Sequence, residues 1–164
     1  MDPTNNNIIY IGGSAISKSI DNGASWNPLA GTFDGTCLYS LEICKSQPNT
    51  IYAATFGNIY VTMNGGTSWT TITSNLPVGS AAISGIAVSD LNPNAAWVTF
   101  SGFSAGDKVY YTNNAGVSWT NVSGTLPNIP ANCIEYQNGS NDLLYIGTDF
   151  GVFYIDASLN NWVP

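Results

Sequence analysis

The residues able to do chemistry in this chain are few, and most of them are acidic. Ten Asp and Glu residues stand against three lysines, Lys18, Lys45 and Lys108, and the sequence contains no Arg and no His. Without His, the Ser/His and Cys/His pairs that activate nucleophiles are excluded. Carboxyl groups remain, and inverting glycosidases use two of them, about 6.5–9.5 Å apart, on opposite sides of a sugar bond. Among enzyme mechanisms, a glycosidase that uses two carboxyl groups is therefore the better candidate.

Most of the acidic residues have a simpler structural interpretation. Asp34, Asp90 and Asp107 fall in predicted loops, where Asp commonly forms turns or is solvated. Glu42 and Glu135 occupy equivalent places in two repeated units, which favours a structural role for both.

The three cysteines do not have the spacing of a metal site, so we expect no metal and no other cofactor. Cys37 and Cys44 lie on one predicted strand, about 20 Å apart, which is too far for a disulfide. We expect buried free thiols. A bridge from Cys133 to one of the other two is the alternative, and it would leave one thiol over.

The charge balance excludes binding to nucleic acid and disfavours attraction to an anionic membrane surface. The net charge is −7, and only 8% of the residues are charged. Binding to nucleic acid needs a basic face that displaces counterions from phosphate, and attraction to an anionic membrane needs the same. No apolar run approaches the about 18–20 residues of a membrane span. The N-terminus lacks the basic and apolar regions of a signal peptide, so a signal for secretion would lie upstream.

One short pattern recurs along the chain: a hydroxyl residue, any residue, Asp or Asn, any, Gly, any, Ser, Trp. It is formed by Ser19, Asp21, Gly23, Ser25 and Trp26, by Thr62, Asn64, Gly66, Ser68 and Trp69, and by Thr112, Asn114, Gly116, Ser118 and Trp119. A degenerate fourth copy of the pattern keeps Asp156 and Trp162, but it lacks the Gly and has one extra residue before the Trp.

Each position of the pattern has a local structural role. The Asp or Asn side chain can bond to backbone N–H groups nearby, and the Gly can adopt a positive φ. The Trp brings a large apolar surface and an indole N–H that needs a partner. The pattern therefore predicts a turn between two strands that is pinned to a core by one ring.

The spacing of the copies predicts the architecture. The four tryptophans, Trp26, Trp69, Trp119 and Trp162, are 43, 50 and 43 residues apart, and a period of about 40–50 residues is typical of four-stranded propeller blades. No helical period is present, and alternation with period two prevails. The predicted strands are 8–12, 15–20, 26–30, 38–44, 51–55, 59–63, 69–73, 83–88, 96–101, 109–112, 119–122, 133–137, 143–148 and 151–155, with a last short one at Trp162.

We therefore expect an all-β fold, a single β-propeller segment of about three and a half to four blades. The repeat units are 1–30, 31–73, 74–122 and 123–164. Because propellers commonly have about 4–8 blades, we expect either a piece of a longer chain, a small closed ring, or completion by a second copy. Open end blades would leave strand edges that invite association.

These repeats resemble the Asp-box, or BNR repeat, of sialidases, sortilin-like receptors, xyloglucanases, a photosystem II assembly factor and many secreted bacterial proteins. The resemblance covers nearly the whole chain and implies a β-propeller and secretion to the cell exterior. It does not imply one activity, because the family mixes enzymes with non-catalytic members. Sialidases hold the substrate carboxylate with three arginines, so the absence of Arg excludes that activity.

Asp149 is the one catalytic candidate, and it comes from this resemblance. The stretch from Gly147 to Gly151 is similar to the strand end that carries a catalytic aspartate in xyloglucanase-like enzymes. It departs from that pattern at Val152, where a second Gly is usual, and in lacking the following Arg. Similar stretches in non-catalytic blades use the Asp to cap a hairpin.

A binding role points to the longest hairpin, at 102–107. Phe103 at its tip has little reason to be buried, and Asp107 adds a polar group; with Trp97 they could bind a sugar. The alternative for Trp97 is a place in the core, because it stands where two other units have Tyr52 and Tyr145.

The combined expectation is a non-catalytic propeller scaffold or binding module, for a glycan or protein ligand, from a larger secreted bacterial protein. One alternative is a fragment of a xyloglucanase-like glycoside hydrolase, in which a second carboxyl group would face Asp149 across an open cleft. A scaffold would instead hold Asp149 within its own hairpin. The other alternative is a propeller fragment that assembles with copies of itself.

Overall fold

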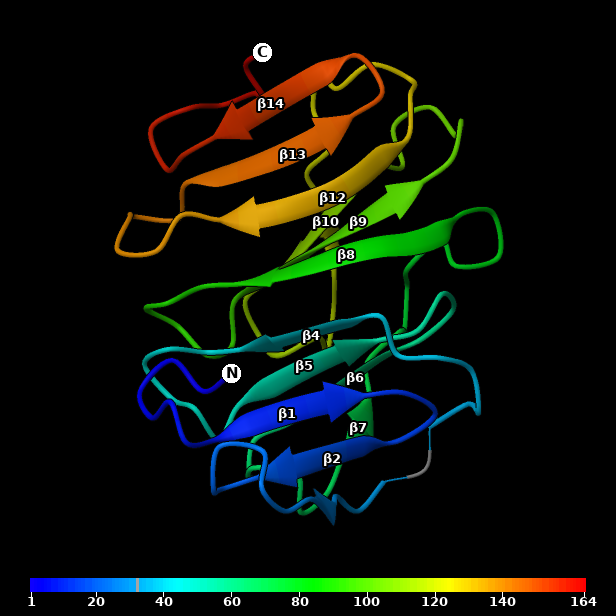
Figure 1. Ribbon diagram of the computed structural model, residues 1–164. Helices are drawn as coiled ribbons and strands as arrows, with labels where there is room; N and C mark the ends of the chain where they lie inside the picture. Colours follow the sequence, from blue (N-terminus) through cyan, green and yellow to red (C-terminus); the bar gives the residue numbers. More distant parts are fainter. Residues whose placement is uncertain (32) are drawn as a thin grey trace.

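The computed structural model describes residues 1–31 and 33–164. Within these residues the chain forms fourteen strands and no helix, hence no helix long and apolar enough to cross a membrane. The strands make four antiparallel sheets that follow one another along the chain (Figure 1). This confirms the prediction of an all-β, partial β-propeller, and each sheet is one blade.

Every blade is a meander whose strand order follows the sequence. Blade 1 contains β1 (Ile9–Gly12), β2 (Ile16–Ser19) and β3 (Asn27–Pro28); blade 2 contains β4 (Ser40–Ile43), β5 (Ile51–Ala54), β6 (Ile59–Thr62) and β7 (Thr70–Thr71); blade 3 contains β8 (Ala82–Val88), β9 (Ala96–Ser101), β10 (Val109–Thr112) and β11 (Thr120–Asn121); blade 4 contains β12 (Ala131–Tyr136), β13 (Leu144–Thr148) and β14 (Gly151–Ile155). In blade 4, Val163 pairs with Tyr154 and begins an outer strand.

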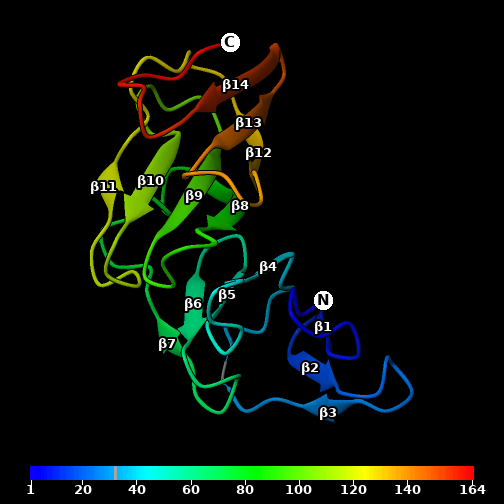
Figure 2. The ribbon, with the colours of Figure 1, turned by 90° about the vertical axis from the view of Figure 1, so that its left-hand side faces the viewer.

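The innermost strands β4, β8 and β12 lie side by side along one face of the molecule (Figure 1). The outer strands β7 and β11 lie on the opposite side, and β3 lies beneath β1 and β2 at the bottom of the view (Figure 2). The register confirms that Glu42 and Glu135 are equivalent, because Glu42 lies opposite Tyr52 and Glu135 lies opposite Tyr145.

Three apolar clusters fill the three interfaces between consecutive blades. The first contains Ile16, Leu38, Ala53 and Tyr60, the second includes Tyr52, Ile72, Ile86, Val98 and Trp119, and the third includes Trp97, Ile134, Leu144, Ile146 and Trp162. The core is thus a series of slabs between sheets, and each blade is stabilised mainly by its neighbours.

The turns at 19–26, 62–69 and 112–119, which we call the box turns, are closed by their own side chains. In the second, Thr62 Oγ1 accepts the N–H of Gly66 at 3.0 Å, and Asn64 Oδ1 accepts the N–H of Ser68 at 3.0 Å. The N–H of Gly65 donates to the carbonyl of Asn49 at 2.9 Å, in the turn between the first two strands of the blade. These two sets of turns therefore share one end of the blades, which we call the box end.

Each box turn contains two consecutive residues with positive φ, although the sequence predicted only one. The expected glycines Gly23, Gly66 and Gly116 have φ of 90°, 90° and 81°. The residues before them are Asn22, Gly65 and Ala115, with φ of 57°, 67° and 54°. Of these three residues, Ala115 adopts the left-handed conformation at the highest energetic cost, because its Cβ makes that conformation unfavourable.

The box-turn tryptophans anchor each blade to the one before it. The indole Nε1 of Trp119 donates to the carbonyl of Ile72 at 2.8 Å, and that of Trp162 donates to the carbonyl of Val122 at 2.9 Å. Both rings are buried, whereas Trp26 in blade 1 is 40% exposed. The Trp of one blade therefore packs against the outer strand of the preceding blade.

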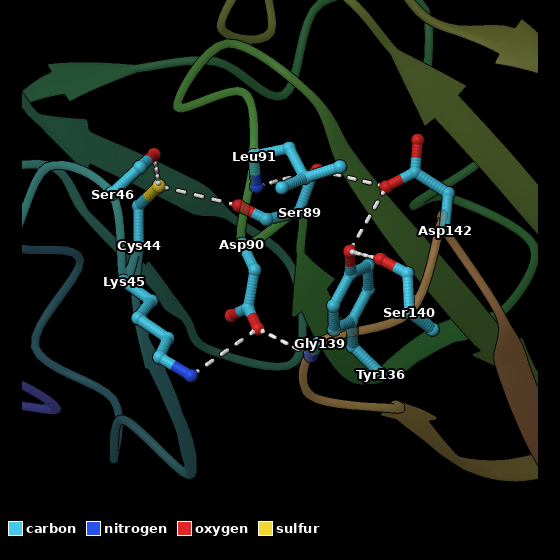
Figure 3. A network of polar contacts seen from close by, with 10 residues as sticks. All are labelled: Cys44, Lys45, Ser46, Ser89, Asp90, Leu91, Tyr136, Gly139, Ser140 and Asp142. Atoms are coloured by element: carbon cyan, nitrogen blue, oxygen red, sulfur yellow. Dashed lines mark hydrogen bonds and ion pairs between the residues drawn. The ribbon is translucent and has the colours of Figure 1, made fainter.

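A polar network centred on the turn after β8 joins blades 2, 3 and 4 at the box end (Figure 3). Asp90 accepts the N–H of Gly139 at 3.1 Å and lies 3.9 Å from Lys45 Nζ. The hydroxyl of Ser89 donates to Asp142 at 2.8 Å. Because the contacts come from three blades, this network fixes how the turns of neighbouring blades sit against one another.

All three cysteines are free, as expected, but the expectation that they are buried is wrong for two of them. Cys44 is buried between blades 2 and 3, where its Sγ contacts the carbonyl of Ser89 at 3.2 Å. Cys37 lies in an exposed loop before β4. Cys133 is exposed because it faces away from blade 3, on the side of β12 that carries Glu135.

We predict that alanine substitution at two equivalent glycines has unequal effects on stability. A Cβ at Gly116 would lie 2.4 Å from Ile72 Cδ1, whereas at Gly23 the nearest atom, in Trp26, is 3.8 Å away. Both changes incur the left-handed cost of about 1–2 kcal/mol, but Gly116→Ala adds overpacking of about 1–3 kcal/mol. Urea unfolding followed by tryptophan fluorescence would measure this; equal losses would contradict the packing role of Gly116.

Candidate functional site

The end of the blades opposite the box turns, which we call the hairpin end, carries exposed aromatic side chains. The loops that join β5 to β6, β9 to β10 and β13 to β14 lie there, because successive antiparallel strands alternate in direction. Phe56, Phe103 and Phe150 occupy these three loops and are 62%, 71% and 84% exposed. Exposed large apolar residues that share one end of a molecule are typical of a binding surface.

Phe56 forms a fixed platform with Tyr39. The two rings are stacked, with centroids 4.9 Å apart and an interplanar angle of 27°. The Tyr39 hydroxyl donates to the carbonyl of Ile83, and the N–H of Ile83 donates to the carbonyl of Phe56 at 3.0 Å. Burial of this hydroxyl raises the pKa of Tyr39. Both rings are therefore tied to the start of β8, and their outer faces remain exposed to solvent.

A carboxylate network lies beside this platform. Asp34 Oδ2 accepts hydrogen bonds from Thr55 Oγ1 at 2.7 Å and Asn58 Nδ2 at 2.9 Å, the two residues that flank Phe56 and Gly57 in the hairpin. Asp34 Oδ1 accepts both the N–H and the hydroxyl of Thr36, at 3.0 and 2.6 Å. Four donors thus order a loop that the sequence suggested to be solvated or turn-forming.

The pKa of Asp34 reflects these contacts. Partial desolvation acts to raise it, but the hydrogen bonds from Asn58, Thr36 and Thr55 outweigh desolvation and hold the pKa well below its usual range. Asp34 is therefore ionised at neutral pH, and the four hydrogen bonds that it accepts hold its loop in place next to an exposed aromatic face.

The three residues proposed for binding from sequence do not form one site. Phe103 is exposed at the tip of its hairpin. Trp97 is buried, with its ring 5.0 Å from Tyr111. Asp107 accepts the Tyr110 hydroxyl at 2.7 Å within its own hairpin.

Lys108, in the same hairpin, is buried. It folds back to donate from Nζ to the carbonyl of Gly102 at 2.6 Å, and burial lowers its pKa. The Lys108 side chain thus ties the hairpin together, and the exposed aromatic side chain of this hairpin is Phe103.

Asp149 lies at the hairpin end, but its carboxylate does not close its own hairpin. Thr148 Oγ1 makes that closure by donating to the carbonyl of Gly151 at 2.8 Å, and Asp149 accepts Asn132 Nδ2 at 2.7 Å. Asp149 directly follows Thr148, which pairs with Ala131 on β12. Glu135 lies four residues further along β12 than Ala131, a backbone distance of about 13 Å. This backbone spacing is longer than the about 6.5–9.5 Å between the carboxyl groups of an inverting pair.

Glu42 and Glu135 instead line a cavity of about 80 Å³ between the innermost strands, together with Asp90 and Asn138. Burial raises the pKa of Glu42 to about 7, and the charge of Glu135 adds to this rise. A cavity of this size is well below the about 300–1,000 Å³ of ligand pockets. The described residues include no group of three or more His, Cys, Asp or Glu side chains placed to hold a metal ion.

Sequence reasoning missed the Tyr39–Phe56 platform and the role of Asp34. Phe56 and Phe150 are, like Phe103, aromatic residues in hairpin loops, so their exposure could have been predicted on the same ground. Tyr39 comes from a different loop, and no spacing rule connects it to Phe56.

Comparison with known proteins gives structural similarity only. No protein-family model matches the chain, and no curated protein matches its sequence. An ancestral GH74 enzyme superposes with a TM-score of 0.75 at 20% identity, over 99% of this chain and 23% of that one. A GH74 xyloglucanase from Xanthomonas campestris gives 0.77 at 14% identity, over 99% and 29%. YCF48 bound to D1 peptide gives 0.56 at 13% identity, over 98% and 65%.

These neighbours are β-propeller proteins, and at such low identity they establish the fold alone. The chain spans about a quarter of the length of the GH74 enzymes and 65% of YCF48.

We predict that Asp34 contributes to the acid sensitivity of the fold. Because its pKa is lowered from 3.8 on folding, its stabilisation is present above about pH 4 and is lost as the pH falls below that value. Asp34→Asn should therefore flatten the fall of the thermal midpoint between about pH 5 and pH 2. Part of the slope should remain, since hydrogen bonds from Ser25 and Ser19 lower the pKa of Asp21 to about 2.

The matched control for this experiment is Asp149→Asn, which removes the same charge at the same end of the molecule. An identical slope for wild type and Asp34→Asn, measured by differential scanning calorimetry, would show that the Asp34 contacts do not stabilise the folded state.

Proposed function

We propose that this chain is a non-catalytic β-propeller segment whose hairpin end binds a glycan, and that it belongs to a larger secreted bacterial protein. The observation that carries the proposal is the stacked Tyr39–Phe56 pair beside the Asp34–Asn58 network. Sugar rings offer C–H faces that pack on aromatic rings, and the Asp34–Asn58 network holds the hairpin that presents the Phe56 ring.

Two further features support a binding module. The box turns resemble the Asp-box repeat, which occurs in secreted proteins with and without catalytic activity. The low content of charged residues, 8%, alongside abundant Asn, Ser, Thr and Gly, also resembles secreted bacterial repeat proteins.

The structural neighbours suggest which ligands to test. The Xanthomonas neighbour is a xyloglucanase, so xyloglucan is the first glycan to test. The YCF48 neighbour is bound to a peptide, which makes a protein ligand at the same surface the alternative to a glycan.

We predict that Phe56→Ala weakens glycan binding. Phe56 is 62% exposed in the free chain. Loss of its burial against a sugar should cost about 1.5–3 kcal/mol, a factor of roughly ten to a hundred in affinity. Affinity electrophoresis through gels that contain xyloglucan, compared with gels without polysaccharide, would measure the change.

The matched control is Leu91→Ala, because Leu91 is also 62% exposed but lies at the box end. Equal retardation of Phe56→Ala and wild type would place binding elsewhere. No retardation of wild type by xyloglucan or by other plant and bacterial polysaccharides would argue against a glycan and in favour of the peptide alternative.

The hydrolase alternative is tested with the same material. Asp149 accepts Asn132 and lies far along the sheet from Glu135, so the expected release of reducing sugar from xyloglucan is none. Release that disappears in Asp149→Asn would establish catalysis and overturn the non-catalytic proposal.

A specific observation also favours self-association as a second candidate. Trp119 and Trp162 pack on a preceding blade, whereas Trp26 is 40% exposed. On blade 4, Tyr145 is 36% exposed, although Tyr52 and Trp97 at the same position in other blades are buried. The two faces correspond to the two sides of the interfaces inside this chain, so the Trp26 face of one copy fits the Tyr145 face of another.

We predict a concentration-dependent rise in mass by light scattering. Trp26→Ser should shift the chain toward the monomer, because it removes the ring that would fill the interface. The control Val117→Ser changes another exposed apolar residue, on a box turn away from both faces. A monomeric wild type at every concentration would refute this second candidate.

A further inference from the structure

A second cavity, at the box end between blades 3 and 4, has the size of a small-molecule site. Its volume is about 360 Å³, within the about 300–1,000 Å³ of known ligand pockets. Three aromatic rings face it, Trp97 and Tyr111 from blade 3 and Trp162 from blade 4. Leu144 and Leu159 add aliphatic walls.

The box turn that borders this cavity departs from the other three. In the regular turns the glycine backbone lies directly on the preceding blade, so a Cβ at Gly66 or Gly116 would approach Leu29 or Ile72 to 2.4 Å. The fourth copy has no such glycine and one extra residue. Val122, which stands where the other blades have Leu29 and Ile72, borders the cavity, and in place of a regular turn the cavity is lined by Asp156, Ala157 and Leu159.

Two carboxylates stand in the wall of this apolar cavity. Asp142 accepts the Ser89 hydroxyl at 2.8 Å and the Tyr136 hydroxyl at 3.2 Å, both on Oδ1 (Figure 3). Asp156 accepts the N–H and hydroxyl of Ser158 at 2.7 and 2.6 Å, also on Oδ1. These hydrogen bonds from Ser158 lower the pKa of Asp156. Both side chains are therefore held in place, and their Oδ2 atoms accept no hydrogen bond from the described residues.

No cation of the protein compensates these two charges. The sequence has only three lysines and neither Arg nor His. Lys45 pairs with Asp90, Lys108 donates to the carbonyl of Gly102, and Lys18 lies over the ring of Tyr10. A pair of carboxylates in an apolar wall favours a ligand that brings its own positive charge.

We propose that this cavity binds a small organic cation, an ammonium group that carries apolar substituents. The aromatic and aliphatic lining packs against the apolar substituents, and Asp142 and Asp156 supply the opposite charge. A bare metal ion suits the cavity poorly, because hard cations require six or more oxygen ligands and most of this wall is carbon. This site is independent of glycan binding at the hairpin end.

The test compares choline with 3,3-dimethylbutan-1-ol, which has the same shape without the charge, by isothermal titration calorimetry. Choline is expected to bind at least about tenfold more tightly, a difference of about 1.4 kcal/mol. Equal affinities, or no heat from choline at about 10 mM, would overturn the proposal. This comparison uses the wild-type chain, so it does not depend on the folding of any variant.

Charge-neutral variants locate the site. Asp142 has φ of 56°, a conformation that Asn tolerates well, so Asp142→Asn keeps the backbone and removes one charge. The double variant D142N/D156N should lose at least about tenfold in choline affinity. The control D149N removes a carboxylate at the opposite end of the molecule and should bind as wild type does. A loss in D149N equal to that in the double variant would reveal only a general charge effect and would overturn the site.

Discussion

The indole hydrogen bonds that join blades 2, 3 and 4 are the interactions on which most of the structure depends. Trp119 reaches the carbonyl of Ile72, and Trp162 reaches that of Val122. Each acceptor lies three residues after the Trp position of its own blade, so blade 3 both provides such a bond and receives one. In blade 2 the Trp69 indole N–H is buried without a partner among the described residues, and it packs beside Leu29 and Phe33 instead. An indole N–H left buried without a partner would cost about 1–3 kcal/mol. This requirement fixes the distance and angle at which two sheets meet, and the apolar slabs between them fill the space so defined.

Because the blades are held by their faces and by the box turns, the loops at the hairpin end carry little of the stabilisation. Those loops differ from blade to blade. Blade 2 has a short hairpin that presents Phe56, whereas blade 3 has a longer one that is braced by Lys108 and presents Phe103. The ordered contacts of Asp34 show that a variable loop can still be rigid. Such division of labour, in which a rigid scaffold displays variable loops, is typical of binding proteins.

The fold could be predicted from sequence because the box turns report it through local chemistry: a hydroxyl, an Asp or Asn, a Gly and a Trp at fixed spacing. The left-handed conformation of Ala115 could not be predicted, since its cost is offset by contacts that only the folded turn provides. The same holds at the site. Phe103 could be predicted to be exposed because its position in a loop tip is a local property. The pairing of Tyr39 with Phe56 and the four donors around Asp34 depend on how two loops meet, and no period or spacing encodes that meeting.

The degenerate fourth copy of the box turn, at 154–162, shows how readily this architecture can change which ligands it binds. The cavity behind Trp162 takes its carboxylate Asp156 from a surface turn that lacks the glycine and has one extra residue, while the strands on either side keep their register. In a repeat protein the same edit is available at every blade boundary, and each edit leaves the other boundaries intact. New pockets can thus be acquired by drift in one turn at a time, and a designer could open or seal them by transplanting turns between blades.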